Sequence, residues 1–387
     1  MPGDTRFTRF FAAYSVNAAG SALSAGALPL IAVVVLDAGP WQVSLLAAAG
    51  LAAGALAAVP LGGYVDRTAR RTAMIAANTI GFACLATVPA AAAIGGLTFA
   101  HLCVVAAVQA IVTIGYTAAA GAYVKDLVPQ RDLAKASARL DTAGWLTQSA
   151  GPPAGGLLIG AIGPTVTVLA DAVSYLASAL MLRGAPAIPA HSPSGVGTDL
   201  LGGWKWISGH QALRRLYLNA MIFGGAVMWS SPLIAVLLLK EMGATAWQYG
   251  LVLGVPCLGG VVGAVLSPRL SARYGQQRVF LLSGLARTPW LLAMPFLHNP
   301  YSVMVVDVFL LLAAGVFNPL FAAYRASVTP AELMGRVIAA WALGSKTVQP
   351  LFIIVGGLAA TALSVRTSLL LAGVMCVASV VALPKVA

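Results

Sequence analysis

Long apolar runs separated by short polar segments make up the pattern of hydrophobic and polar positions along this chain. Residues 38–65 and residues 72–124 contain no Lys, Arg, Asp or Glu. A helix needs about 20 consecutive apolar residues to span a bilayer, and many of the runs are that long. Strands of a transmembrane barrel would instead alternate apolar and polar residues over about ten positions. The pattern therefore predicts an all-α membrane protein that crosses the bilayer many times.

Twelve membrane spans follow from this pattern. Four breaks between them fall at residue pairs that favour turns, namely Gly39-Pro40, Gly95-Gly96, Gly163-Pro164 and Asn299-Pro300. The first apolar run is too long for the core of a signal peptide, so we expect it to be retained as a span. The predicted spans are 10–36, 42–64, 72–94, 97–123, 138–162, 164–183, 214–239, 248–268, 279–297, 302–324, 337–360 and 367–384.

One connection is much longer than the others and covers residues 184–213. It begins Gly-Ala-Pro-Ala-Ile-Pro, continues with Trp204 and Trp206, and leads into Arg214 and Arg215. Aromatic and basic residues in this combination indicate an amphipathic helix at a membrane surface. The predicted domains are an N-terminal six-helix bundle at 1–183, a cytoplasmic linker with this helix at 184–213, and a C-terminal six-helix bundle at 214–387.

Composition supports a membrane protein, because 59% of the residues are hydrophobic and only 9% are charged, against about a quarter charged in soluble domains. The net charge of +12 is compatible with nucleic-acid binding, but the basic residues are scattered among short loops, which argues against such a surface. Nineteen of the 23 Lys and Arg lie at the termini and in connections after even-numbered spans. By the positive-inside rule, both termini are expected on the cytoplasmic side of the cell membrane.

The chain also repeats itself with an offset of 201 to 206 residues. Four pairs of segments match in the same order: 29–33 with 232–236, 41–42 with 247–248, 122–123 with 323–324, and 155–156 with 356–357. Four ordered matches indicate two homologous halves. Because each half has an even number of spans, the halves are parallel repeats about an axis along the membrane normal.

The sequence carries no signature of an enzyme, a cofactor site or a metal site. It lacks a Walker-type loop, an HExxH motif and a Gly-x-Ser-x-Gly motif, and no soluble segment is long enough to bind a nucleotide. The four cysteines lie inside apolar runs without CxxC spacing. We therefore interpret them as small buried hydrophobic residues rather than as disulfides or metal ligands.

Two motifs stand out from the apolar background. The loop after the second span packs four charges into ten residues and reads Gly62-Gly63-x-x-Asp66-Arg67-x-x-Arg70-Arg71. Its two glycines allow another helix backbone to approach closely. The fifth span contains Gly151-Pro152-Pro153-Ala154-Gly155-Gly156, which favours a kink and tight packing on a partner helix.

These motifs resemble those of the major facilitator superfamily, and the resemblance covers the whole chain. The loop is similar to the superfamily's signature loop, and the run at 151–156 is similar to the antiporter motif of drug:proton exporters. The Leu-Val-Pro loop at 127–129, the sequence Asp-Ala-Val-Ser-Tyr from Asp171, and Leu-Arg-Arg before the seventh span are similar to the macrolide-efflux and siderophore-exporter-like branch. The resemblance implies a twelve-helix drug:proton antiporter that works by alternating access.

The resemblance also implies a gating role for the loop. In the superfamily the glycines face the eleventh span, which here starts near Gly335-Arg336. A helix N-terminus carries about half a positive charge. We therefore expect Asp66 to latch against it when the cytoplasmic side is closed, helped by Arg67, Arg70 or Arg336. The alternative is a basic loop that only sets topology.

Two features depart from the superfamily pattern. The fourth span has no arginine, where many drug:proton antiporters place one, so the coupling mechanism is left open. The loop at 267–275 keeps its basic residues but has serine in place of Asp66. Only the first half therefore carries the complete loop.

Charged residues inside the spans are functional candidates, because burying a charge in the bilayer is costly. Lys346 lies roughly 13 Å from the cytoplasmic end at 1.5 Å per residue, and it faces either a central cavity or a structural partner. Asp307, Asp37 and Asp171 are candidates for proton coupling, although Asp171 is favoured as structural and Asp37 as a solvated loop residue. Asp307 is either a proton carrier or the ion-pair partner of Arg287.

Polar and aromatic residues near the middle of six spans form the predicted lining of a central cavity. An apolar lining with a few polar groups suits a bulky amphipathic ligand. Each residue would serve equally well in hydrogen bonds between helices. The candidates are Asn17, Gln109, Thr113, Tyr116, Trp145, Gln148, Asn219, Trp229, Phe317, Asn318, Trp341, Lys346 and Gln349.

The sequence therefore predicts a monomeric secondary active transporter that exports a small amphipathic compound, such as a drug, an antibiotic or a secondary metabolite. It would exchange this compound for protons by rocking its two halves around a midplane site. Two alternatives stay open: an importer or symporter of a small polar solute on the same fold, and a membrane receptor or interaction protein that does not transport. The expected partners are the substrate, protons and the lipid bilayer.

Overall fold

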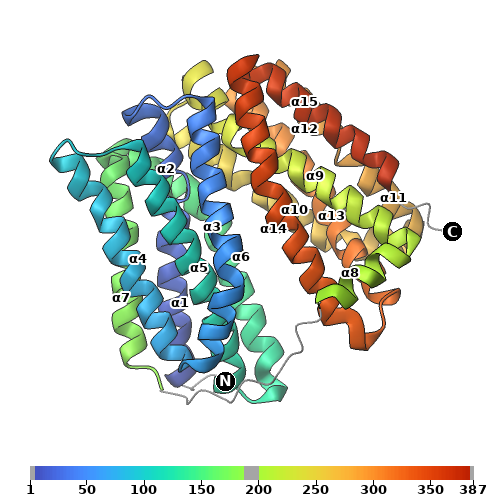
Figure 1. The fold of residues 1–387 in the computed structure, drawn as a ribbon, viewed down its shortest axis with the longest axis horizontal. Helices are drawn as coiled ribbons and strands as arrows, with labels where there is room; N and C mark the ends of the chain where they lie inside the picture. The colour runs from blue at the N-terminus through green and yellow to red at the C-terminus, as the bar shows by residue number, and fades with distance from the viewer. Residues whose placement is uncertain (1–4, 187–199, 384–387) are drawn as a thin grey trace. The chain divides into compact units, whose positions relative to one another are not determined.

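The computed structural model describes residues 5–186 and 200–383, and every regular element within these ranges is a helix. Figure 1 shows the long helices that make up the fold. Eleven helices in the described ranges are long and apolar enough to cross a membrane. This result confirms the prediction of an all-α protein with many membrane spans.

The helices follow one another with short connections. The first half of the chain contains α1 (Thr5–Ser24), α2 (Ala27–Leu30), η1 (Ile31–Val35), α3 (Pro40–Arg67), α4 (Arg70–Ala93), α5 (Phe99–Leu127), α6 (Gln130–Ile162) and α7 (Pro164–Arg183). The rest contains α8 (Leu200–Gly209), α9 (Gln211–Val236), η2 (Leu237–Glu241), α10 (Ala246–Tyr274), α11 (Gln276–Ala286), α12 (Pro289–Ala293), η3 (Met294–Phe296), α13 (Pro300–Ser327), α14 (Ala331–Ala362), α15 (Val365–Ala378) and η4 (Ser379–Ala382).

Within the described ranges, the helix at the predicted fifth span is not apolar enough to count as a membrane span. This helix, α6, is 33 residues long, but it is not among the eleven apolar helices. The reason is its sequence, since glycines, prolines and polar side chains lower its hydropathy. The count of twelve spans therefore stays a prediction.

Local turn chemistry explains where the helices begin. Each of the four predicted breaks falls between two helices or at the first residue of one. Gly163 has a φ of 85°, a backbone conformation that glycine adopts readily and other residues rarely do, and Pro164 then starts α7. Asn299 caps α13, because its side chain accepts a hydrogen bond from the amide of Tyr301.

Two predicted spans are interrupted. The first span breaks at Ala25 and Gly26, between α1 and α2. The ninth span breaks after α11, and α12 then starts at Pro289. Proline lacks the amide hydrogen that would continue the helical ladder, which accounts for the second interruption.

The internal repeat reappears in the local structure. The repeated segment 29–33 leads into the π-helix η1, and its counterpart 232–236 leads into the π-helix η2. Each π-helix is followed by a residue with positive φ, Asp37 in the first half and Gly243 in the second. The same sequence thus produces the same unusual backbone in both halves.

The chain divides into two compact units. Unit 1 consists of Met1–Asp37, Ala49–Gly195 and Thr245–Gly250, and unit 2 consists of Ala38–Ala48, Val196–Ala244 and Leu251–Ala387. In unit 1, α7 packs on α1 and α4, α1 packs on α6, and α4 packs on α5. In unit 2, α14 packs on α8, α9 and α15, and α11 packs on α13.

Each unit has its own apolar core. The core of unit 1 gathers around Phe10, Tyr123 and Leu182, which are almost fully buried. The core of unit 2 gathers around Phe317 and Trp341 together with leucines of α9. These cores hold the helices whose polar side chains are described next.

Candidate functional site

The basic residues of the predicted gating loop bind groups of their own unit. Arg70 lies 4.0 Å from the carboxylate of Asp126 in α5. Arg71 donates hydrogen bonds to the carbonyl oxygens of Leu182, at 2.9 Å, and Arg183. These carbonyls end α7, where a cation is favoured by the helix dipole. The two arginines therefore join α4 to α5 and α7.

The remaining gating residues are only partly described. The surroundings of Gly62 and Gly63 and the side chain of Asp66 lie outside what the structure describes, so the latch stays a prediction. Arg67 is exposed at the end of α3. At the start of α14, a methyl group built on Gly203 of α8 would overlap the carbonyl oxygen of Arg336. Helix α8 thus packs directly on the turn where Asp66 was predicted to bind.

The glycines of the antiporter-like motif provide close helix packing within unit 1. A methyl group on Gly151 would overlap Ala22 of α1, and one on Gly155 would overlap the carbonyl oxygen of Leu23. Gly156 meets the backbone at Ala246 in the same way. Helix α6 runs without interruption through Pro152 and Pro153. The motif therefore brings α6 against the last turn of α1.

Several predicted cavity residues of unit 1 instead bond to neighbouring helices. The buried side chain of Asn17 donates to Asn78 at 3.0 Å, and Asn78 donates to Ser178 at 2.9 Å. Gln109 donates to the carbonyl oxygen of Gly81 at 3.2 Å. Tyr116 is 4% exposed, and its ring lies 6.4 Å from that of Tyr14. These contacts connect α1, α4, α5 and α7.

Three other candidates of unit 1 are accessible. Trp145 and Gln148 of α6 are exposed, and they make no hydrogen bond within the described part of the chain. Thr113 is exposed as well, with its hydroxyl bonded to the carbonyl oxygen of Gln109 in its own helix at 2.8 Å. The exposure of these three side chains makes them accessible to a ligand.

In unit 2, Asn219 and Arg287 form a buried pair. Arg287 is 3% exposed and donates to the Asn219 side chain at 2.5 Å, while Asn219 donates to the Ser379 carbonyl at 2.7 Å. The guanidinium lies between two rings, 3.9 Å from the centroid of Phe223 and 3.8 Å from that of Phe317. Stacking of this kind stabilises a desolvated cation.

This arrangement argues against one of the two alternatives for Asp307, an ion pair with Arg287. The partner of Arg287 is an amide, because α9 brings Asn219 to it. Among the described residues, Asp307 makes no hydrogen bond or ion pair, and its carboxylate lies near the thiol of Cys257 in α10. The nitrogen Nε of Arg287 also has no hydrogen-bond partner in the described ranges.

Two tryptophans of unit 2 are packing residues. Trp229 donates its indole N–H to Ser368 at 2.9 Å and is 6% exposed. Trp341 is equally buried, with the rings of Tyr217 and Phe321 each 5.1 Å from its own. Neither indole face is open to a ligand in this conformation.

The accessible candidates of unit 2 are Asn318, Lys346 and Gln349. Asn318 is exposed, and Lys346 and Gln349 are half-buried. Lys346 and Asn318 make no hydrogen bond or ion pair with any residue that the structure describes. The amide of Gln349 lies next to Gly224 of α9.

The other two candidate carboxylates differ sharply in environment. Asp37 is exposed in a turn with a φ of 49°, as expected for a loop residue. Asp171 of α7 is 4% exposed and bonds to serine hydroxyls of α1 and α7. Asp171 is thus fully enclosed by its own unit.

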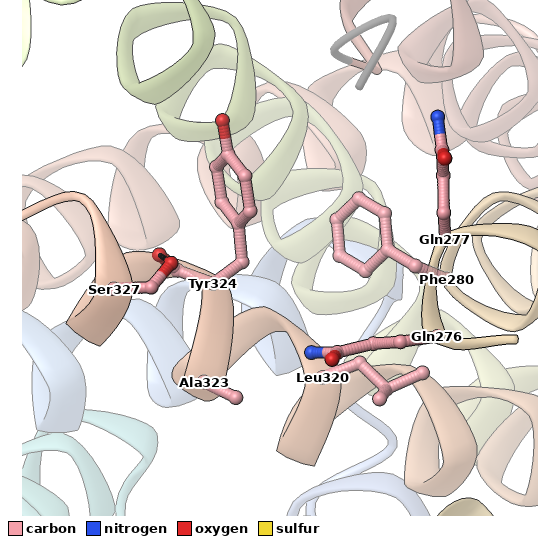
Figure 2. A pocket seen from close by; sticks show the side chains of 7 residues that line it. All are labelled: Gln276, Gln277, Phe280, Leu320, Ala323, Tyr324 and Ser327. Atoms are coloured by element: carbon pink, nitrogen blue, oxygen red, sulfur yellow. Dashed lines mark hydrogen bonds between the residues drawn. The ribbon is translucent and has the colours of Figure 1, made fainter. Parts of the chain in front are cut away.

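A pocket of about 280 Å³ lies between the start of α11 and the end of α13. Figure 2 shows the rings of Phe280 and Tyr324 next to each other, with Gln276 extending toward Leu320. The pocket is lined mainly by apolar surface, and Gln277, Ala323 and Ser327 complete its lining. The predicted cavity residues do not line it.

Sequence reasoning missed several polar residues that the structure brings together. Asn78 and Ser178 extend the network of Asn17, and an isolated asparagine inside an apolar span was the signal for the first. Arg366 bonds to Glu241 at 2.9 Å and to the carbonyls of Pro295 and Leu297. No local pattern links these segments, which are far apart in the sequence.

Comparisons with known proteins agree with this architecture. A 98-residue stretch is 28% identical to the D-xylose transporter of Levilactobacillus brevis, which is 25% of this chain and 21% of that protein. The nucleoside transporter NupG has a similar structure, with a TM-score of 0.78 and 14% identity over 98% of both chains. A bacterial homologue of the iron transporter ferroportin has a TM-score of 0.71 and 16% identity, over 97% of this chain and 98% of that one.

One protein-family model matches nearly the whole sequence and identifies the family of this chain. The family model of the Major Facilitator Superfamily matches residues 10–312 and 216–386. The matched regions include the glycine motif of α6, the loop between α3 and α4, and both copies of the internal repeat. The chain therefore belongs to the Major Facilitator Superfamily.

Proposed function

We propose that this protein is a secondary active transporter of the cell membrane that exports a small amphipathic compound in exchange for protons. The observation that supports export is the packing of Gly151 and Gly155 of α6 against the backbone of α1. Close packing is the physical property that the exporter-type motif provides, and here it fixes α6 to the last turn of α1. Alternating access would then occur with both termini in the cytoplasm.

The substrate groups we propose are the accessible candidates. In unit 1 they are Trp145, Gln148 and Thr113, and in unit 2 they are Asn318, Lys346 and Gln349. An aromatic face, neutral amides and one cation suit a compound that is mostly apolar with a few polar groups. Asn17, Asn219, Trp229 and Trp341 serve instead as structural residues, because their polar atoms or rings are already used by neighbouring helices.

For proton coupling we propose Asp307. A proton carrier must gain and lose its proton during each cycle, and a tight ion pair would hold it in the charged state. Asp307 is half-buried in α13 and has no ion pair or hydrogen bond among the described residues. Asp37 is exposed, and the carboxylate of Asp171 is enclosed by hydroxyl groups, so both fit this role less well.

Transport in everted membrane vesicles tests the proposal. An acid-inside gradient is imposed, and a hydrophobic antibiotic, a pentose and a nucleoside are offered in turn as labelled compounds. Export by proton antiport predicts accumulation of the amphipathic compound, loss of accumulation with an uncoupler, and loss of coupling in Asp307→Asn. Accumulation that persists unchanged in Asp307→Asn would contradict the role of this carboxylate.

A second candidate function is import of a small polar solute. The short match to a D-xylose transporter favours it, as do the neutral amides of Gln148 and Asn318. The same compounds are offered to right-side-out vesicles with an acid-outside gradient. Gradient-driven uptake of the pentose or the nucleoside there, without antibiotic accumulation in everted vesicles, would support the importer and overturn the exporter.

A further inference from the structure

The carboxylate of Asp171 lies at the centre of an oxygen cluster inside unit 1. The hydroxyl of Ser24 lies 2.5 Å from Oδ2. The hydroxyls of Ser21 and Ser174 lie 3.4 and 3.3 Å from Oδ1. Ser21 also bonds to the hydroxyl of Tyr175 at 3.3 Å. Every hydrogen-bond partner of this carboxylate in the described ranges is therefore a neutral hydroxyl group.

The cluster sits where the first membrane span is interrupted. Helix α1 ends at Ser24, and the amide of Ala25 donates to the Ala22 carbonyl, three residues back. The Ser24 hydroxyl also contacts the Ser21 carbonyl at 3.3 Å. The C-terminal end of a helix carries about half a negative charge. The end of α1 thus adds negative potential to that of the carboxylate.

No cation compensates this potential in the described part of unit 1. The nearest basic residue along α7 is Arg183 and the nearest along α1 is Arg9. Each lies twelve residues from the cluster, or about 18 Å at 1.5 Å per residue. Arg71 of α4 is bound to the far end of α7. A buried carboxylate at a helix C-terminus, without a positive partner, is costly.

The second half of the chain shows that the fold does not require this arrangement. The repeat offset of 201 to 206 places the counterpart of Asp171 within residues 372–377, which contain no acidic residue. The counterpart of α1 is α9, which is continuous from Gln211 to Val236. The break and the carboxylate therefore occur together, and only in the first half.

We propose that Asp171, Ser21, Ser24 and Ser174 form a binding site for one sodium ion. A single carboxylate balances a single positive charge, and hydroxyl oxygens complete a shell of hard ligands, as at other discontinuous membrane helices. Two oxygens that bind the same cation at right angles, each about 2.4 Å from it, lie about 3.4 Å from each other. The distances from Ser21 and Ser174 to Oδ1 match this spacing and exceed the ~2.8 Å of an ordinary O–H···O hydrogen bond. The Ser24 hydroxyl is instead hydrogen-bonded directly to Oδ2 at 2.5 Å, and the Ser174 hydroxyl also donates to the backbone carbonyl of Asp171 at 2.8 Å.

The antiporter-like motif of α6 supports the geometry of this site. Gly151 and Gly155 let the α6 backbone approach Ala22 and Leu23, directly before Ser24. Gly20 of α1 faces Ser174 and Asp171 from the other helix, where a methyl group would overlap the Ser174 hydroxyl. The last turn of α1 is thus held between α6 and α7. Bound sodium would fix the interrupted span to α7.

Sodium binding to the purified full-length protein tests this site without any transport. Thermal unfolding is measured in choline chloride with increasing NaCl at constant ionic strength, with KCl as the comparison. The midpoint Tm is expected to rise with the logarithm of the sodium concentration above Kd. Binding of radioactive sodium gives the stoichiometry, expected to be one ion per chain.

Three variants decide where the ion binds. Asp171→Asn should abolish the sodium dependence, and Ser24→Ala should weaken the sodium affinity by about tenfold or more, as expected for loss of a coordinating group. Asp307→Asn is the matched control, because it removes another half-buried carboxylate within a span and should leave sodium binding unchanged. Ser24→Ala and Ser174→Ala keep the carboxylate, so they test the site even if Asp171→Asn fails to fold.

Two outcomes would overturn the proposal. The first is a Tm that does not respond to sodium, or responds equally to sodium and potassium. The second is sodium binding that survives in Asp171→Asn. If lowering the pH stabilises the protein through Asp171 while sodium has no effect, the cluster binds a proton instead. Because these measurements involve no substrate, their failure leaves the proposed transport function untouched.

Discussion

Among single residues, Trp145 and Trp341 form a contrasting pair, because Trp145 is accessible and Trp341 is packed inside unit 2. Trp145 is 55% exposed, whereas Trp341 is 6% exposed and contacts Tyr217 and Phe321. Trp341→Ala should destabilise the protein by about 3–5 kcal/mol, because it leaves a cavity in an aromatic cluster. Trp145→Ala should change stability by less than about 0.5 kcal/mol. Thermal unfolding in detergent measures both.

The same pair of variants distinguishes ligand contact from packing. Transport by Trp145→Ala should be reduced, since this indole is one of the proposed substrate groups. If Trp145→Ala unfolds as readily as Trp341→Ala, its side chain packs against another part of the protein. A Trp145→Ala variant with normal stability and normal transport kinetics would remove this residue from the substrate site.

Asn219 and Asn318 are a second matched pair of residues. Asn219→Leu removes the amide that bonds to the buried Arg287. A buried hydrogen bond to a charged group contributes about 1.5–3 kcal/mol, so the loss of stability should be of that size. Asn318→Leu should have little effect on stability, because Asn318 is exposed. Equal changes in unfolding temperature for the two variants would contradict the buried pair.

These residues also show what the sequence could predict. It identified Asn219, Arg287 and Trp229 as polar or charged groups at membrane depth, since such residues are rare there. It did not reveal that the partner of Arg287 is Asn219, because that contact depends on how α9 and α11 are rotated against each other. Polarity is visible in a sequence, whereas the direction of a side chain is fixed by long-range packing.

At the scale of helices, α6 offers a direct test of close packing. Gly155→Ala would overlap the Leu23 carbonyl of α1, whereas Gly160→Ala enters open space in the same helix. Forcing a methyl group into a packed helix contact costs about 1–3 kcal/mol. Gly160→Ala should be neutral or stabilising, because alanine is favoured over glycine inside a helix by about 0.5–1 kcal/mol.

Thermal unfolding of the two α6 variants measures this difference. Gly155→Ala should unfold at a lower temperature than the wild type, and Gly160→Ala should not. If both variants behave alike, the glycines of the motif matter for backbone flexibility rather than for the distance between α6 and α1. The proposed link between the motif and export would then lose its structural basis.

The helices differ in how well the sequence predicts them. Turn chemistry is local, so the breaks at Gly163-Pro164 and Asn299-Pro300 were found at the right positions. The interruptions inside the first and ninth spans were missed, because the apolar runs resume directly after Gly26 and Pro289 and each pair of runs was read as one span. The break after α1 lies beside Asp171, more than 140 residues away in the sequence. Only the tertiary structure brings these two features together.

For the whole molecule, the distribution of Lys and Arg predicts its orientation in the membrane. Lys240 lies at the end of η2 on the face that has few basic residues. Gln276 begins α11 on the opposite face, next to Arg273 and Arg278. The positive-inside rule places the second face in the cytoplasm. The pocket in Figure 2, which Gln276 lines, would then open toward the cytoplasm.

Cysteine labelling of intact cells tests this orientation. Lys240→Cys and Gln276→Cys are introduced separately into a variant whose four native cysteines are alanine. A membrane-impermeant maleimide should label Lys240→Cys in intact cells and Gln276→Cys only after permeabilisation. Both positions are exposed, and the positive-inside rule predicts that they lie on opposite membrane faces. The reverse pattern would mean that the basic residues do not set the topology, and export in everted vesicles would then have to be reinterpreted as import.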